Sequence, residues 1–248
     1  MRILLISLLL FIAFDCYSQE EKSVNNLNGV KDTLAVKVNG KLLVANAGFA
    51  PIPAFSFDNP LAIGFLSLKK KRFSYEPDFA LGLNGKPWIT NHWFRLIILK
   101  TSVIIVRTGI NPFLFFESER IPSGDERIHV QRNITFKLAT EHQLSKKWSL
   151  TLTYRYNNGN DGGLSGHLYD ASGSLSGIVI SKMISIDLKP QLFYFDLTGK
   201  FDGLFTSGSI YILHQQLPIS IYFQAVLPLW TSFEGNHFNW NSGLFYSF

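Results

Sequence analysis

The residues best suited to chemistry in this chain lie in a Gly- and Ser-rich stretch, residues 157–173. The stretch contains Asp161, His167 and Asp170, which are the ingredients of a general acid–base pair or of a weak metal site. The Gly and Ser residues around them leave the geometry of the three side chains open. We interpret the stretch as a solvated loop, so the sequence predicts no catalytic residues, no metal site and no cofactor.

Cysteine chemistry is absent from the mature chain that the sequence predicts. A positive start followed by the apolar residues 3–14 is typical of a signal peptide, because this run is too short to cross a bilayer as a helix. Cys16 and Ser18 are small residues just before a cleavage site, so residues 1–18 are predicted to be removed. A lipoprotein site at Cys16 is the alternative, but Asp15 stands where such a site has a small residue. With Cys16 removed, neither a disulfide nor a thiolate site is available.

The composition indicates a membrane β-barrel. Aromatic residues make up 15% of the 248 residues, with 22 Phe, although the mean hydropathy is only +0.12. A water-soluble domain of this length rarely needs so many large apolar rings. After residue 18 there is no run of about twenty apolar residues, which excludes a helical membrane protein. A barrel fits both observations, because its lipid-facing residues are apolar while alternate residues face a polar interior.

The charge does not indicate a nucleic-acid partner. The formal net charge is +5, and the one dense basic run, residues 69–72, lies between two strand-like segments. A solvated turn is the simpler interpretation of that run.

Apolar and polar residues alternate with the period of a β-strand along most of the chain. In residues 147–157, Trp148, Leu152 and Tyr154 share one face, while Thr153 and Arg155 share the other. Residues 74–84, 128–143 and 219–224 repeat the pattern. In residues 193–198 the same reasoning places Phe193, Phe195 and Leu197 on the lipid side and Asp196 inside.

The links between these segments favour an outer-membrane barrel over a soluble sandwich, which would show the same alternation. Short polar links are predicted at residues 69–72, 100–101, 144–146, 189–190 and 215–217. Longer links are predicted at residues 84–90, 117–127, 157–173, 199–203 and 228–236. Such an order of short periplasmic turns and longer outside loops is typical of these barrels.

The predicted fold class is therefore all-β, a transmembrane antiparallel up-and-down β-barrel of about twelve strands. Counting through the links gives eleven strands from Leu61 to Phe248, and residues 41–55 supply the strand that makes the total even. The barrel then occupies residues 41–248. Residues 19–40 form a periplasmic lead or a partial plug.

Strand parity assigns a set of polar side chains to the barrel interior. These lumen-lining candidates are Glu76, Asp78, Arg95, Lys137, Glu141, Arg155, Asp187, Asp196 and Gln224, with Gln131 and Asn133 beside them. Their mixed charges could line a constriction, or they could pair across the lumen and close it. A barrel of roughly twelve strands encloses a lumen between the filled and the open sizes. The favoured function is a narrow passive channel or transporter for small polar solutes; the alternative is a barrel that docks another outer-membrane complex.

The last residues of the chain form a recognisable pattern. Asn241, Gly243, Tyr246 and Phe248 are spaced as polar-x-Gly-x-x-aromatic-x-aromatic and end on the final residue. This pattern resembles the signal at the end of outer-membrane barrels that is read by their assembly machinery, where an edge strand pairs by strand addition. The resemblance implies an integral outer-membrane location, with the assembly machinery, outer-membrane lipid and lipopolysaccharide as partners.

Several longer segments resemble an uncharacterised family of barrel proteins of the Bacteroidota. They are NGKPW at residues 84–88, WFR at 93–95, KPQLFY at 189–194, DG at 202–203 and FNWNSGLFYSF at 238–248. The resemblance covers most of the chain from about residue 40. It implies the fold and the membrane, and it implies no activity.

An enzymatic barrel is the least favoured alternative. YRYNNG at residues 154–159 lies where the lipid A deacylases, which are twelve-stranded, carry a His-x-Ser-Asn pattern. Arg155 and Asn157 stand at the His and Ser places, so both the base and the nucleophile of an acyl hydrolase are missing. The sequence therefore predicts that the protein is not an enzyme.

Overall fold

The computed structural model describes residues 35–48, 57, 59–120, 126–160, 165–198, 201–232 and 238–248. The predicted signal peptide with Cys16, residues 19–34 of the predicted lead and Asp161 lie outside the described residues. Within the described ranges, no helix is long and apolar enough to cross a bilayer.

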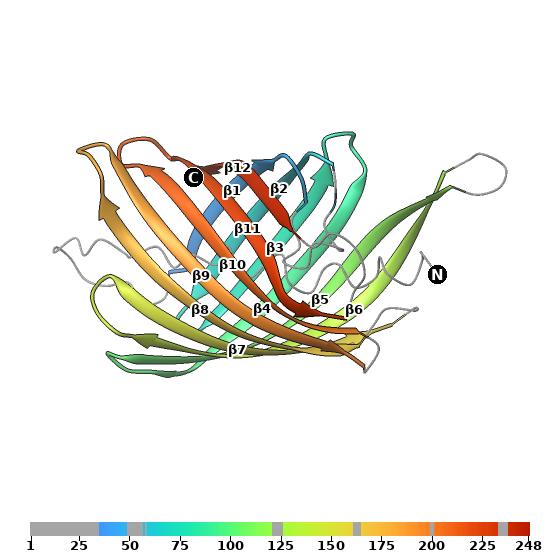
Figure 1. The fold of residues 1–248 in the computed structure, drawn as a ribbon, viewed down its shortest axis with the longest axis horizontal. Coiled ribbons are helices and arrows are strands. Elements are labelled where there is room, and N and C mark those ends of the chain that lie inside the picture. The colour runs from blue at the N-terminus through green and yellow to red at the C-terminus, as the bar shows by residue number, and fades with distance from the viewer. Residues whose placement is uncertain are drawn as a thin grey trace.

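Twelve antiparallel β-strands form one closed barrel (Figure 1). Each strand pairs with its neighbours in chain order, and β12 pairs with β1 to close the wall. The strands are β1 (Lys37–Ala45), β2 (Leu61–Lys70), β3 (Phe73–Gly82), β4 (Pro87–Lys100), β5 (Ile104–Arg120), β6 (Glu126–Gln143), β7 (Trp148–Gly159), β8 (Gly166–Val179), β9 (Ile184–Leu197), β10 (Phe201–His214), β11 (Ile219–Thr231) and β12 (Asn239–Ser247). The predicted fold class and strand number are confirmed.

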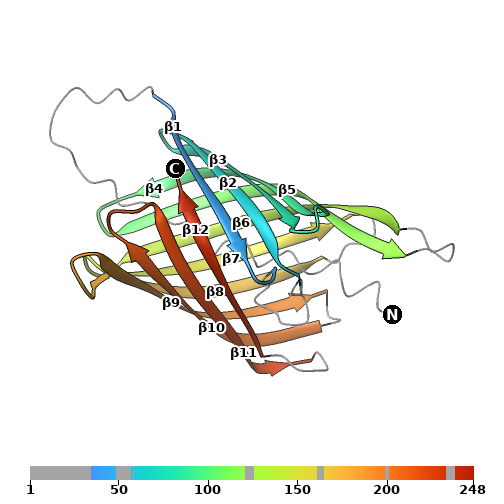
Figure 2. The ribbon, with the colours of Figure 1, turned by 90° about the horizontal axis from the view of Figure 1, so that it is seen from above.

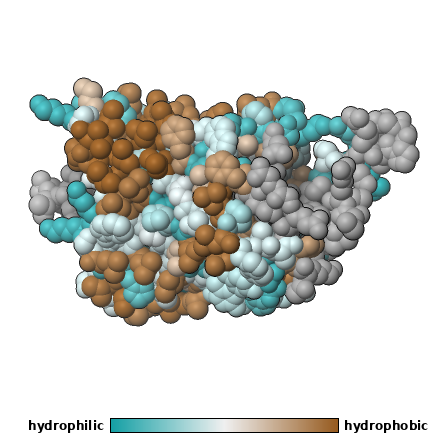
Figure 3. All heavy atoms as spheres, viewed as in Figure 1, coloured by the Kyte–Doolittle hydropathy of each residue, from teal (hydrophilic) through white to brown (hydrophobic). Residues whose placement is uncertain are grey.

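The period-two pattern of the sequence becomes an inside and an outside of the barrel wall. In β7, Thr153, Arg155 and Asn157 are buried, while Leu152 and Tyr154 between them are exposed. β3, β6 and β11 follow the same rule with the faces that the sequence predicts. The outward residues form an apolar surface, and Figure 3 shows large apolar patches on one face of the barrel. Such a surface is suited to contact with lipid tails.

Barrel closure extends to the last residue of the chain. The β1–β12 register runs from Ala45 opposite Gly243 to Lys41 opposite Ser247, and Figure 2 shows the two strands side by side. β1 begins at Lys37, so the barrel takes in residues 37–40, which the sequence analysis assigned to the lead. This difference arises because residues 37–40 pair with residues 66–69 of β2, and Gly40 also pairs with Phe248.

The links fall on two rims. The turn rim carries residues 71–72, 101–103, 144–147, 180–183 and 215–218, together with the C-terminus. The described link residues of the loop rim are 46–48, 59–60, 83–86, 160, 165, 198, 232 and 238. The links of the loop rim are shorter than predicted, because the strands extend into them. β5 and β6 extend farthest, as a hairpin that projects beyond the wall (Figure 1).

The predicted short link at residues 189–190 is wrong. Lys189 and Pro190 lie inside β9, and the β8–β9 turn is residues 180–183. In that turn the Ser181 hydroxyl accepts the backbone N–H of Ile184 at 3.1 Å. Pro190 has no N–H for a ladder, and it is tolerated because the β8–β9 pairing passes from Ser172 opposite Gln191 to Leu175 opposite Leu188 and leaves Pro190 unpaired with β8.

Candidate functional site

The inner wall of the barrel holds the polar side chains that parity assigns to it, with one exception. The following predicted lumen-lining side chains are buried or half-buried on the inward faces of their strands: Glu76, Asp78, Arg95, Lys137, Glu141, Arg155, Asp187 and Gln224, with Gln131 and Asn133. The exception is Asp196.

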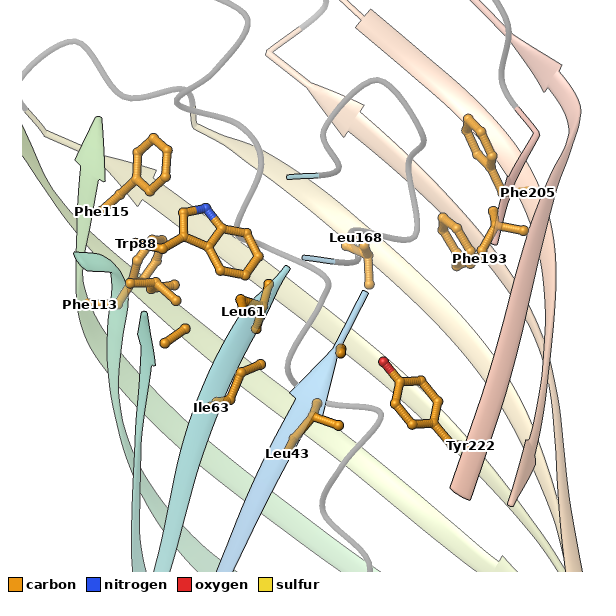
Figure 4. Packing of buried hydrophobic residues seen from close by; sticks show 14 of the residues in the cluster. Leu43, Leu61, Ile63, Trp88, Phe113, Phe115, Leu168, Phe193, Phe205 and Tyr222 are labelled. Carbon is orange, nitrogen blue, oxygen red and sulfur yellow. The ribbon is translucent and has the colours of Figure 1, made fainter. Parts of the chain in front are cut away.

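Asp196 faces outward, contrary to the prediction. In β9 the buried residues are Gln191, Phe193, Phe195 and Leu197, so Asp196 lies on the opposite face of the strand. Aromatic rings occupy both faces of this segment, Phe193 and Phe195 on one and Tyr194 on the other, so its alternation does not reveal which face meets the lipid. Burial decides: Phe193 and Phe195 are each 1% exposed, and their rings stack on Phe205 of the neighbouring strand β10 at 5.4 and 5.5 Å between centroids. Figure 4 shows Phe193 and Phe205 together in the interior.

A charged cluster surrounds Trp93 on the wall formed by β3, β4 and β6. Arg95 Nη1 lies 3.2 Å from Glu76 Oε2, and the Arg95 guanidinium lies 4.8 Å from the centre of the Trp93 ring. Lys137 Nζ is 5.9 Å from the same ring. Two cations therefore share one indole, whose π face attracts positive charge. Glu76, which also lies 4.0 Å from Lys69 Nζ, balances part of this charge.

A chain of buried side-chain hydrogen bonds runs beside this cluster. Asn91 Nδ2 donates to Asp78 Oδ1 at 2.7 Å, and Asn111 Nδ2 donates to Asn91 Oδ1 at 2.8 Å. The backbone N–H of His92 donates to Asn111 Oδ1 at 2.7 Å. All three side chains are almost fully buried. A connected polar network of this kind rigidifies the wall and fixes where its donors and acceptors point.

The charged pairs of the inner wall join neighbouring strands. Arg107 Nη1 lies 2.7 Å from Glu141 Oε2 between β5 and β6, and Arg155 Nη2 lies 3.8 Å from Asp170 Oδ2 between β7 and β8. Glu76 and Arg95 join β3 to β4 in the same way. The sequence left open whether such charges line the lumen or pair across it. These pairs run along the wall, so they do not bridge the lumen.

The opposite wall combines amides, hydroxyls and rings. Ser207 donates its hydroxyl to Gln191 Oε1 at 3.0 Å, and Lys189 Nζ lies 5.0 Å from the centre of the Tyr211 ring. Sequence reasoning missed Gln191 and Lys189, because it ended a strand at residues 189–190. The alternation of Ser207, Ser209 and Tyr211 in β10 was the sequence signal that could have identified the β10 residues that contact Gln191 and Lys189.

Trp88 narrows the interior near the loop rim. The β3–β4 register pairs Ala80 with Ile89 and Leu81 with Pro87, so Trp88 is the extra residue of a bulge. The bulge turns its side chain inward, where it is 2% exposed. Its ring stacks on Phe57 at 5.0 Å, and Figure 4 shows it beside Phe113 and Phe115. Phe57 forms an isolated bridge with Gly48, and its contact with the buried Trp88 places the Phe57 ring inside the barrel.

The side chains considered for catalysis are separated by the wall. His167 faces outward, where its Nδ1 bonds the Tyr154 hydroxyl at 2.9 Å, whereas Asp170 is buried inside. Asn157 lies inside, where its Oδ1 accepts from the Thr135 hydroxyl at 3.1 Å. In the part of the chain that the structure describes, no group of three or more His, Cys, Asp or Glu could hold a metal ion.

The four residues of the C-terminal pattern take different places in β12. Asn241 is buried and donates through Nδ2 to the carbonyl of Ala47 at 2.9 Å. A Cβ at Gly243 would lie 2.5 Å from the Tyr222 ring and 2.8 Å from the carbonyl of Val44, so this position requires glycine. Tyr246 and Phe248 are exposed on the outer surface, with their rings 6.2 Å apart.

Comparisons with known proteins support the fold through solved structures. No protein family matches the chain, and no curated protein matches it. The KdgM porin is 11% identical, with a TM-score of 0.57 over 85% of this chain and 99% of the porin. The KdgM porin in complex with disordered oligogalacturonate is 10% identical, with a TM-score of 0.54 over 86% and 99%. An outer membrane channel from Pseudomonas putida F1 is 12% identical, with a TM-score of 0.51 over 89% and 98%.

At these identities the likeness shows the fold. The chain folds as an integral outer-membrane β-barrel, with an apolar outer surface and a partly polar inner wall.

Proposed function

We propose that this protein is a narrow passive channel for small polar solutes in the outer membrane. The observation that carries the proposal is the inner wall, on which three ion pairs join neighbouring strands: Glu76 with Arg95, Arg107 with Glu141 and Arg155 with Asp170. Such pairing neutralises the charges and keeps their side chains against the wall. The KdgM porin and the outer membrane channel share the fold of this chain, and this shared fold is their support for the proposal.

The chemistry of the wall favours polar solutes without a strong net charge. A solute that sheds water on entry needs replacement hydrogen bonds, and the amides and hydroxyls of Gln191, Ser207, Gln224 and Asn133 lie on the inward faces of their strands. Arg95, Arg107 and Arg155 are each paired with a carboxylate on a neighbouring strand, which weakens the preference of the wall for ions of either sign. The apolar interior near Trp88 restricts the size of the solute.

Planar-bilayer recording of the refolded protein tests the proposal. We expect discrete current steps in a KCl solution, and swelling of protein-containing liposomes in small uncharged sugars but not in large oligosaccharides. Boiled, unfolded protein from the same preparation is the control. If the folded protein inserts but gives neither steps nor swelling, the channel proposal is wrong.

We also propose that β12 is the segment read by the barrel assembly machinery. The paired segment between β12 and β1 is shorter than that between any other two neighbouring strands. The exposed rings of Tyr246 and Phe248 lie on its outer side at the turn rim. A strand that is offered as an edge before closure can pair with another chain by strand addition.

We infer that the chain is not an acyl hydrolase. His167 is engaged by Tyr154 on the outer surface, and Arg155 and Asn157 point into the barrel. A nucleophile and its base must lie within hydrogen-bond reach of each other, and these side chains do not supply such a pair.

A further inference from the structure

A groove with an apolar floor and a polar edge lies on the outside of the wall formed by β4, β5 and β6. Its volume is about 690 Å³, and its lining includes His92, Pro112, Leu114, Arg132, Ile134 and Asn160. These residues alternate with the buried Asn91, Phe113 and Asn133, so they belong to the lipid-facing side.

The groove coincides with an irregularity in the β4–β5 ladder. The register passes from Asn91 opposite Phe113 to Phe94 opposite Ile110, without a pair for His92 or Trp93. Pro112 has no N–H, and the N–H of His92 donates instead to the inward side chain of Asn111. The usual pairing is lost at this point, and Pro112 forms part of the groove.

The polar edge of the groove is held in place from two sides. The backbone N–H of Asn160 donates to the carbonyl of Arg132 at 3.0 Å, which joins the end of β7 to β6. On the other side, His92 Nδ1 bonds the Tyr75 hydroxyl at 2.8 Å, and the two rings are stacked. Asn160 lies in the β7–β8 link, so this edge is at the loop rim.

Arg132 is an exposed cation on β6, between the apolar floor and the polar edge of the groove. Its outward neighbours on β6 are Val130 and Ile134. A charged side chain on the lipid side is unfavourable at depth and is tolerated at the interface, where anionic headgroups lie. The guanidinium can donate two parallel hydrogen bonds to one phosphate, and the apolar floor of Pro112, Leu114 and Ile134 is suited to an acyl chain.

We propose that this groove binds a phosphorylated glucosamine lipid, the lipid A part of lipopolysaccharide, with a phosphate on Arg132 and an acyl chain along the floor. The loop rim faces the outer leaflet in the orientation that short periplasmic turns and longer outside loops predict, and lipid A is the phosphate-bearing lipid of that leaflet. The proposal does not require the barrel to conduct, because the groove lies outside the wall.

Native mass spectrometry of the full-length barrel in detergent tests the proposal with bisphosphorylated lipid A as the probe. We expect Arg132→Gln to weaken its apparent affinity at least tenfold, and dephosphorylated lipid A to bind wild-type protein at the level of the variant. Arg72→Gln is the matched control, because Arg72 is an exposed arginine at the opposite rim, and it should leave binding unchanged. Heat modifiability on a gel shows that each variant is folded.

Two outcomes would overturn the proposal. Equal binding by folded wild-type and Arg132→Gln protein would show that the groove is not the site. Equal or tighter binding of phosphatidylglycerol in competition would assign the groove to a phospholipid headgroup instead. Current steps measured on the same variant separate this question from the channel function, because Arg132→Gln should conduct like wild type.

Discussion

Gly40 and Phe248 exchange both backbone hydrogen bonds, and the Phe248 ring covers the Gly40 Cα. Each N–H···O distance is 2.9 Å, and a Cβ at Gly40 would lie 2.2 Å from Phe248 Cε2. An aromatic ring over a glycine on a paired strand is a known way to pin register. The pairing between β1 and β12, which closes the barrel, therefore continues to Phe248.

Deleting Phe248, or replacing Tyr246 and Phe248 by Ser, should reduce the amount of folded barrel in the outer membrane. The deletion removes both hydrogen bonds with Gly40 and the Phe248 ring, and the double replacement removes both aromatic side chains proposed to mark the strand for assembly. The heat-modifiable fraction in membrane extracts measures the effect. Phe73→Ser is the control, because Phe73 is another exposed ring next to the turn rim; normal levels of the Phe248 variants would contradict the assembly proposal.

Glu76→Gln should make the channel prefer anions. The change removes the carboxylate that lies 3.2 Å from Arg95 and keeps the positive charges of Arg95 and Lys137 beside Trp93, so the chloride-to-potassium permeability ratio should rise about two- to fivefold. The reversal potential in a KCl gradient measures it. Asp196→Asn removes the same charge from the outer face and should leave the ratio unchanged, whereas an effect as large as that of Glu76→Gln would place Asp196 in the lumen after all.

Asn111→Ala should destabilise the barrel by about 2–4 kcal/mol, since Asn91 Oδ1 and the backbone N–H of His92 both lose their hydrogen bond with the Asn111 side chain. Urea unfolding in lipid vesicles, followed by tryptophan fluorescence, gives the free energy of unfolding. The matched control is Asn158→Ala, an exposed amide on β7, for which we expect a change within about 0.5 kcal/mol. Similar losses for both variants would rule out a special role for the buried network.

Trp88→Ala should raise the single-channel conductance. Trp88 fills part of the interior and packs against Phe57 of the β1–β2 link, so removing the indole widens the passage and loosens the link. Trp240→Ala removes an indole that is exposed on the outer surface and should leave conductance unchanged. A conductance for Trp88→Ala equal to that of wild type would show that the narrow point lies elsewhere.

The inward faces of β3, β6, β7 and β11 could be predicted from the sequence alone. In β6, Gln131, Asn133 and Thr135 alternate with Ile134 and Phe136, and a strand buried on one side admits only one orientation of such a pattern. The even strand number followed from counting these segments and their links. Local alternation is sufficient wherever polar residues occupy one face and apolar residues the other.

Other features required the tertiary structure. The segment from Phe193 to Leu197 has aromatic rings on both faces, and only the burial of Phe193, Phe195 and Leu197 in the closed barrel decides that these three point inward. The bulge at Trp88 and the register shift in β8 depend on the neighbouring strand, because a bulge is a mismatch between two partners.

The sequence by itself determined that this chain is a twelve-stranded barrel with a closing strand at Phe248, because period-two burial and link positions are local properties. The tertiary structure decided which charges meet, such as Arg155 with Asp170 and Glu76 with Arg95. Pairing across strands depends on register, which is set by the whole closed ladder and not by any one segment. The sideways neutralisation of the lumen charges, on which the proposed function rests, is for this reason a property of the closed barrel.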